Sequence, residues 1–258
     1  MSINTDRTTP VNGVISLSAD EHTIGGIPVS PFESLSACAQ RILTDVRNGV
    51  GGFAIAINAE KVITCSRDRN LEATIERATL RYPDGAGVVV AMRLKGARSA
   101  RVAGADLWLE VLRQSRGQSL SVALIGAKPE VLAATRRRLE ADFPDIVVSV
   151  ARNGYDGARD IDALTRELAA AKPDIVFVAL GSPRQELMIE RFRAVHGAGF
   201  YMGLGGSFDI YAGVKKRAPL WMQRRGLEWL FRFLAEPSRA PRETKRLKFL
   251  ALLVLGRL

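Results

Sequence analysis

The sequence predicts an α/β fold: a doubly wound, Rossmann-like parallel sheet flanked by helices, followed by a basic helical C-terminal appendage. From Leu120 onward, short apolar segments alternate with amphipathic ones, which is the pattern of βαβ units. The apolar segments are hydrophobic at nearly every position, as strands covered on both faces are. Beyond Gly213 this alternation gives way to a basic stretch that contains two of the three tryptophan residues.

The first half of the chain predicts fewer elements. A helix is expected after Ser30-Pro31, because Leu35, Cys38, Ile42 and Val46 recur at helical spacing. Proline cannot continue a helix, so Pro83 should end the next one. The other predicted elements are strands over residues 13–18, 24–30 and 52–58 and a helix over Leu71–Arg81.

The second half predicts a regular succession of strands and helices. The expected strands cover residues 119–126, 145–151, 174–181 and 199–206, and the expected helices cover residues 128–143, 160–172 and 184–195.

The charge is distributed unevenly. The net charge is +10, and residues 213–258 hold twelve basic residues against three acidic ones, so almost all of the excess lies in the tail. Such asymmetry indicates an anionic partner. We expect a disordered start over residues 1–13, a Rossmann-like domain over residues 14–212 and a basic, membrane-associating appendage over residues 213–258.

Several classes of protein have little support. Cys38 and Cys65 have neither a CxxC partner nor histidines at ligand spacing, so we expect two buried, reduced thiols. The first residues lack the basic and apolar segments of a signal peptide, so nothing directs the chain out of the cytosol. The longest apolar run, Phe249–Leu255, is far shorter than the roughly 20 residues of a membrane-spanning helix.

Residues that directly follow strands are the first candidates for a site, because ligands of parallel sheets bind at the carboxyl ends of the strands. Four points qualify: Asn58, Gly126-Ala127, residues 181–186 and residues 203–207. The last contains Gly205 and Gly206 in Gly-Leu-Gly-Gly, where the backbone can approach a phosphate or sugar. Neither a GxGxxG nor a GxxxxGK[ST] motif is present, so dinucleotide and P-loop ATP sites lose their motif support.

Two acidic motifs each allow a structural and a chemical interpretation. Asp84, in Tyr-Pro-Asp-Gly-Ala-Gly, is either a turn or capping residue or a general base presented by a flexible loop. Asp160-Ile161-Asp162 has the DxD spacing that holds a metal in many glycosyltransferases. It also opens an amphipathic helix, where acidic residues act as caps, and we favour the cap. The sequence therefore predicts no metal site and no cofactor.

A family resemblance rests on blocks that follow one another along the chain. They are PDGAGVV, RVAGADL, ALIGAKPEV, NGYDG, KPDIVFVALGSPRQE and GLGGSFDIYAGVKKRAPLWMQRRGLEWLFRFLAEPSR. Over about residues 14–242 the chain closely resembles the WecG/TagA/CpsF glycosyltransferases. The resemblance implies an inverting, metal-independent hexosyl- or N-acetylhexosaminyltransferase. Its donor would be a UDP-sugar, its acceptor a polyprenyl-diphosphate-linked sugar, and its product a teichoic acid, enterobacterial common antigen, capsule or exopolysaccharide.

The resemblance also implies roles for individual residues. Asp84 matches the proposed catalytic base, and Asn58, Arg101 and Gln185 match polar residues of the substrate cleft. Ala56 stands where the family has a threonine, which removes one hydroxyl from the pocket. The appendage arginines that match those thought to neutralise diphosphate are Arg232, Arg239 and Arg242.

The tail suggests a location at the inner face of the cell membrane. Lys245, Arg246 and Lys248 precede an apolar run, and we expect them to bind lipid phosphates while the apolar side chains insert. A homo-oligomer is a further possibility. A nucleic-acid-binding protein or a non-catalytic membrane scaffold would also use a basic, aromatic tail, but would leave Asp84 and the glycine-rich strand ends without a role.

Overall fold

The computed structural model describes residues 21–155 and 160–258. The disordered start expected over residues 1–13 and the strand expected over residues 13–18 lie outside these ranges. The described chain is an α/β structure built on one six-stranded parallel sheet. The Rossmann-like architecture predicted from the sequence is therefore confirmed.

The sheet has the strand order β4-β3-β8-β7-β5-β6, and every neighbouring pair is parallel. All carboxyl ends therefore lie along one edge. The strands are β3 (Gly52–Ile57), β4 (Leu80–Pro83), β5 (Leu120–Gly126), β6 (Ile146–Arg152), β7 (Ile175–Ala179) and β8 (Phe200–Gly203). A separate antiparallel hairpin is made by β1 (His22–Ile24) and β2 (Ile27–Val29).

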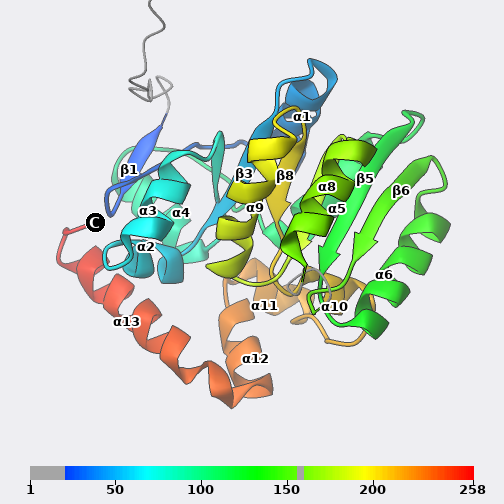
Figure 1. The fold of residues 1–258 in the computed structure, drawn as a ribbon. Coiled ribbons are helices and arrows are strands. Elements are labelled where there is room, and N and C mark those ends of the chain that lie inside the picture. Colours follow the sequence, from blue (N-terminus) through cyan, green and yellow to red (C-terminus); the bar gives the residue numbers. More distant parts are fainter. Residues whose placement is uncertain (1–20, 156–159) are drawn as a thin grey trace, which may run out of the picture.

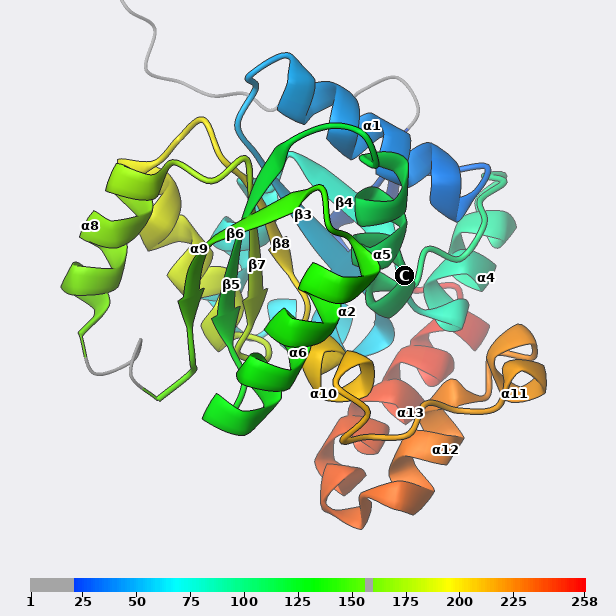
Figure 2. The ribbon, with the colours of Figure 1, turned by 90° about the vertical axis from the view of Figure 1, so that its right-hand side faces the viewer.

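Two apolar cores cover the two faces of the sheet, as the apolar strands predict (Figures 1 and 2). On one face Trp108 lies among Phe177, Phe208 and Tyr211. The helices of that face are α1 (Leu35–Arg47), α5 (Gly104–Gln114), α6 (Pro129–Asp142) and α10 (Ser207–Tyr211). The helices of the other face are α2 (Ala59–Cys65), α3 (Arg69–Glu76), α4 (Ala86–Leu94), α8 (Ile161–Ala171), α9 (Arg184–Val195) and α13 (Ala240–Val254).

The C-terminal segment is helical, as expected. Between α10 and α13 lie α11 (Leu220–Arg224), α12 (Glu228–Ala235) and the short helix η1 (Pro237–Arg239). Helix α13 returns to the body and packs along α2, where the side chain of Phe249 is completely buried (Figure 1). One face of α13 therefore belongs to the core of the protein.

Two predictions for the first half need correction. The helix expected over Leu71–Arg81 ends at Glu76, and the residues before Pro83 form β4, which lies wholly in the core. Its buried arginine, Arg81, donates to Glu21 at 2.8 Å and to three backbone carbonyls at and just after the end of α3, while its Nε atom has no hydrogen-bond partner among the described residues. Helix α1 forms as predicted, but Ser34 caps it, since its side chain accepts a hydrogen bond from the Ala37 amide.

Candidate active site

The carboxyl ends of β3 and β4 bring Asn58 and Asp84 to the same edge of the sheet. The two strands are adjacent, with Ile57 opposite Pro83, so the residues that follow them are neighbours. Gly85 touches Asn58 so closely that a Cβ on this glycine would lie 3.2 Å from the Asn58 Cβ atom. Asn58 also caps α2, because its side-chain oxygen accepts from the Lys61 amide at 3.0 Å. One end of its amide is thus fixed by the fold.

Asp84 is held from three directions. Its amide donates to the Ile57 carbonyl at 2.9 Å, and its carbonyl accepts from the Arg101 Nε atom at 2.7 Å. Its carboxylate Oδ1 atom accepts from the amide of Gly104, the first residue of α5, at 3.1 Å. Asp84 therefore satisfies a helix start, but that of α5 rather than of the helix that follows it. The positive end of the α5 dipole stabilises a charged carboxylate at this position.

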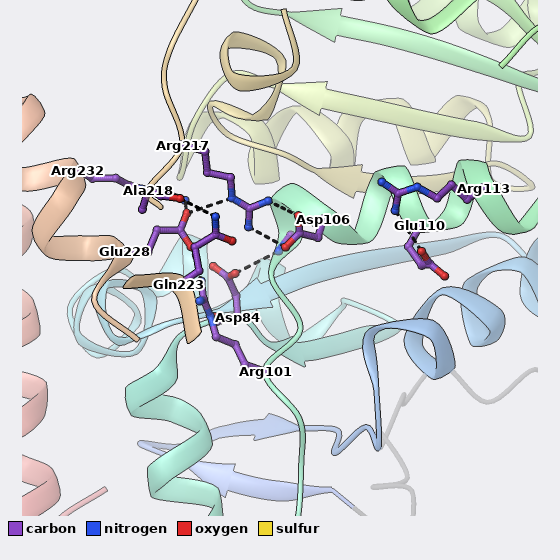
Figure 3. A network of polar contacts seen from close by, with 11 residues as sticks. Asp84, Arg101, Asp106, Glu110, Arg113, Arg217, Ala218, Gln223, Glu228 and Arg232 are labelled. Carbon is purple, nitrogen blue, oxygen red and sulfur yellow. Dashed lines mark hydrogen bonds and ion pairs between the residues drawn. The ribbon is translucent and has the colours of Figure 1, made fainter. Parts of the chain in front are cut away.

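Beside Asp84, three arginines surround one buried carboxylate, Glu228 at the start of α12 (Figure 3). Arg101 donates to the Glu228 Oε2 atom at 2.8 Å. Arg232 donates to the Oε1 atom, and the Arg217 Nε atom lies 3.8 Å from that same oxygen. We call Glu228, Arg101, Arg217 and Arg232 the arginine cluster. It joins the C-terminal segment to the loop that carries Asp84.

Within the arginine cluster, the guanidiniums stabilise the charged form of Glu228. Burial alone would raise the pKa of Glu228, but Arg232 and Arg101 outweigh it and lower the pKa to about 2. Arg217 also makes a bidentate ion pair with Asp106 in the first turn of α5, with the Nη2 and Oδ2 atoms 2.7 Å apart. This contact ties the segment before α11 to the same helix start that binds Asp84.

Gln185 holds the glycine loop that follows β8. Its side-chain oxygen accepts from the Gly205 amide at 2.9 Å, and its side-chain nitrogen donates to Glu186 at 3.0 Å. The backbone of Gly203 passes so close that a Cβ there would lie 2.5 Å from the Gln185 Nε2 atom. Gln185 is almost fully buried, so the structure gives it a clear contact with the loop.

Glu186 forms a buried ion pair with Lys61, at 2.9 Å between the Nζ and Oε1 atoms. Burial would raise the pKa of Glu186, but the ammonium of Lys61 and hydrogen bonds from Lys61 and Gln185 lower it. Lys61 also donates to the Ala56 carbonyl at 3.0 Å, which links β3 to the start of α9.

The glycine loop itself is open. Gly205 has a positive φ of 57°, and a Cβ at this residue would meet no atom within 4 Å. Gly206 is exposed and directly precedes α10. The Gly205 amide already donates to Gln185, so it is not available to a ligand. The loop leaves space for a ligand because it has no side chain there, and the neighbouring backbone groups are the ones that could bind it.

Arg242 lies apart from the arginine cluster. Arg242 is exposed, and its Nε atom lies 3.6 Å from Glu60 in the first turn of α2. The side chain of Arg239 lies outside the described part of the structure. The structure thus places Arg101 against Asp84 and links Arg232 to Arg101 through Glu228. Asn58 lies beside the Asp84-Gly85 turn, while Gln185, Gly205 and Gly206 lie at the ends of β7 and β8 on the same edge of the sheet.

The basic residues of α13 depart from expectation. Lys245 donates to the Thr64 hydroxyl at 2.9 Å, and the Arg246 guanidinium lies over the Trp229 ring, 5.0 Å from its centroid. Both side chains contact the protein, so of the three residues expected to bind lipid only Lys248 is exposed. Lys245 is directed toward α2 and Arg246 toward α12. In the described residues, no helix has the length and apolarity to cross a membrane.

The remaining sequence-based expectations concern Asp160 and the cysteines. The Asp160 Oδ1 atom accepts from the Ala163 amide at 2.8 Å, so the capping interpretation of the DxD motif is confirmed. Within the described ranges, no three His, Cys, Asp or Glu side chains converge in a way that could hold a metal ion. Cys38 and Cys65 are buried free thiols.

A model of the WecG/TagA/CpsF glycosyl transferase family matches residues 22–258, nearly the whole chain. The chain belongs to this family. The WecG/TagA/CpsF proteins are glycosyltransferases of cell-surface polysaccharide synthesis, which in general use a sugar donor and a lipid-linked acceptor. The sequence-based assignment to WecG/TagA/CpsF is confirmed, and the match extends beyond Arg242 to the end of α13.

Sequence reasoning missed the residues that connect this WecG/TagA/CpsF site. Glu228, Arg217 and Asp106 all stand inside the quoted blocks, in GLEW, KKRAP and GADL. An acidic residue within a strongly basic tail was the available signal for Glu228, since a lone carboxylate among arginines is usually paired. The sequence could not show the hydrogen bond from the Gly104 amide to Asp84, because the backbone of any residue other than proline could donate it.

Proposed function

We propose that this protein is an inverting, metal-independent glycosyltransferase. It moves a sugar from a UDP-sugar to a polyprenyl-diphosphate-linked sugar at the inner face of the cell membrane, in teichoic-acid-type, capsule or exopolysaccharide assembly. The observation that carries this proposal is the position of Asp84, a fixed carboxylate at the carboxyl edge of the sheet that Arg101 contacts and connects, through Glu228, to Arg232.

Asp84 is the residue we assign as general base. Its Oδ1 atom binds the Gly104 amide, and among the described residues no hydrogen bond engages its Oδ2 atom. In the proposed reaction this oxygen accepts the proton of the acceptor hydroxyl, whose oxygen attacks the anomeric carbon. The bond from that carbon to UDP breaks on the opposite face, which inverts the configuration. The products are the glycosylated acceptor, UDP and a protonated Asp84 that returns its proton to solvent.

The guanidiniums of the arginine cluster are the groups we assign to the diphosphate. A leaving UDP gains negative charge, and positively charged donors that the fold holds in place stabilise such charge strongly. The side chains of Arg101 and Arg232 are 25% and 43% exposed, so both retain a surface that a ligand can reach. Asn58 and the loop at Gly205 and Gly206 would line the sugar, and Ala56 lacks the hydroxyl and the methyl group that a threonine would place there.

We propose the segment after residue 212 as an appendage that completes this site and associates with the membrane. Helix α13 presents an outward apolar stripe in addition to the face that packs on α2. Leu247, Leu250 and Val254 recur at helical spacing along this stripe and are exposed, together with Lys248. Such a surface lies in the headgroup region of an anionic bilayer. Phosphatidylglycerol vesicles should therefore bind the protein.

The proposed function is tested by a screen of UDP-sugars with a short-chain polyprenyl-diphosphate-sugar acceptor. We expect acceptor-dependent release of UDP with one donor, and a higher Tm in the presence of UDP. Single-stranded oligonucleotide at moderate salt should leave the Tm unchanged. A Tm raised by oligonucleotide but not by UDP, with no donor turned over, would favour the nucleic-acid interpretation of the basic tail instead.

A further inference from the structure

Glu228 has no task in the proposed reaction, yet it is the most enclosed charge of the arginine cluster. Its side chain is 4% exposed, whereas those of Arg101, Arg217 and Arg232 are 25%, 21% and 43% exposed. The carboxylate is therefore the least exposed member of the arginine cluster, and the three more exposed guanidiniums are arranged around it (Figure 3). An anion bound from solvent would meet the arginines first and leave Glu228 in place.

Arg101 connects Glu228 to Asp84. Its Nε atom donates to the Asp84 carbonyl at 2.7 Å and one terminal nitrogen donates to Glu228 at 2.8 Å. Because a guanidinium is a rigid plane, fixing two of its nitrogens fixes the whole group. The remaining terminal nitrogen then has a defined direction, which depends on Glu228.

The balance of charge also limits what Glu228 can be doing. The cluster places three guanidiniums within reach of one another, and like charges at such separations repel. Glu228 and the Asp106 partner of Arg217 neutralise two of the three charges, which leaves one positive charge in excess. A buried carboxylate thus permits the arginines to remain together before any diphosphate arrives.

We propose that Glu228 is a positioning residue for the transfer reaction: an internal counter-anion that orients Arg101 and Arg232 toward the diphosphate and, through Arg101, fixes the loop that carries Asp84. This inference rests on the proposed function and deepens it. In this proposal a single side chain of α12, Glu228, determines how the arginines are oriented.

The test compares Glu228→Gln with Glu243→Gln, a matched control that removes the same charge from the same C-terminal segment. Glu243 pairs with Arg246 on α13, and among the described residues it makes no hydrogen bond or ion pair with a member of the arginine cluster. A displacement of about 1 Å at reacting groups can cost about a hundredfold in rate, so we expect Glu228→Gln to lower kcat about ten- to a hundredfold. The affinity for UDP should stay within about threefold of wild type, because the variant keeps every guanidinium and gains a positive charge. Glu243→Gln should match wild type in both quantities.

Hydrogen–deuterium exchange supplies a readout that does not depend on activity. In Glu228→Gln, amides of residues 98–104 and 228–236 should exchange faster, while those of β5 and β7 stay protected. Unchanged exchange, or a kcat within about twofold of wild type, would overturn the proposal. A parallel loss of kcat and of UDP affinity would also overturn it, because Glu228 would then act by forming the binding site rather than by orienting it.

A second variant covers the case in which Glu228→Gln does not fold. Glu228→Asp keeps the charge but withdraws the carboxylate by one methylene, so it can no longer reach Arg101 and Arg232 together; we expect a lower kcat with a Tm near that of wild type. Full kcat in Glu228→Asp would contradict the positioning role. If wild-type protein turns over no donor, the proposed function fails, while the exchange experiment still decides whether Glu228 orders the Asp84 loop.

Discussion

At the scale of a single residue, the ionisation of Glu228 makes the stability of the fold depend on pH. Its pKa of about 2 in the folded protein lies below the usual 4.5, because Arg232 and Arg101 outweigh the effect of burial. A lowered pKa means that this carboxylate stabilises the fold at pH values above its unfolded pKa, and that the contribution is lost as the pH falls from about 4.5 toward about 2. The free energy of unfolding of wild type should therefore fall, relative to that of Glu228→Gln, across this window.

Urea unfolding of both proteins at a series of pH values from neutral to acidic measures this difference. If the difference in unfolding free energy between the two proteins stays constant as the pH falls, the arginines do not lower the pKa of Glu228 in the folded protein.

Lys61 is the residue whose loss should most destabilise the body of the protein. Glu186 is completely buried, and its Oε2 atom has no hydrogen-bond partner in the structure, so Lys61→Met would leave a buried charge without a counter-ion. Breaking such a pair costs about 3–5 kcal/mol, whereas replacing both members with apolar residues is often nearly neutral. We expect Lys61→Met to lower the urea midpoint, and Lys61→Met combined with Glu186→Met to restore most of it. Equal midpoints for wild type and Lys61→Met would contradict this account.

At the scale of elements, α13 has two faces with separate roles. Removing the helix would expose the apolar surface that Phe249 covers, so a truncated protein would lose stability as well as any contact with the membrane. Truncation therefore cannot measure membrane binding alone. Leu250→Glu with Val254→Glu changes only the outward stripe, and Val254 is 86% exposed. These changes should weaken sedimentation with phosphatidylglycerol vesicles and leave turnover of a soluble acceptor analogue unchanged.

Val147→Glu is the control for α13, because Val147 is exposed on β6 at the opposite end of the sheet (Figure 1). It should sediment as wild type does. Unaltered sedimentation of the Leu250→Glu, Val254→Glu protein would show that α13 does not contact the bilayer.

The sequence predicts the regular elements well where hydrophobic periodicity is strong, and poorly where tertiary contacts decide. The strands and helices from Leu120 to Val195 form nearly as expected, since each strand is a continuous apolar run. β4 was not predicted because its four residues include Arg81. The charge of Arg81 is tolerated in the core because Glu21 and backbone carbonyls accept hydrogen bonds from its guanidinium. A strand stabilised by such distant contacts cannot be distinguished from the end of an amphipathic helix by periodicity.

The site shows the same division between local and distant information. Asp84, Arg101 and Arg232, which the motif blocks selected, are connected in one network through Glu228. Residue spacing could not show that Glu228 would lie among the arginines, because 127 residues separate it from Arg101. Only the fold brings those two segments together.

At the scale of the whole molecule, we predict that turnover does not depend on a divalent metal. In the proposed reaction the arginine cluster would supply the positive charge that a metal would bring to a diphosphate, and Asp160 is engaged as the cap of α8. Activity in EDTA should equal activity in untreated buffer. Loss of activity that is recovered with manganese or magnesium would contradict the proposed stabilisation of the leaving group by arginines.

The most direct test of the whole account is the turnover of Asp84→Asn under conditions in which wild type releases UDP. The amide keeps nearly the same shape and can still accept a hydrogen bond from Gly104, but it cannot take the proton of the acceptor hydroxyl. The account predicts a fall in kcat of roughly two to four orders of magnitude with an almost unchanged affinity for UDP. Near-normal turnover by pure Asp84→Asn would show that Asp84 only caps α5 and that the base lies elsewhere.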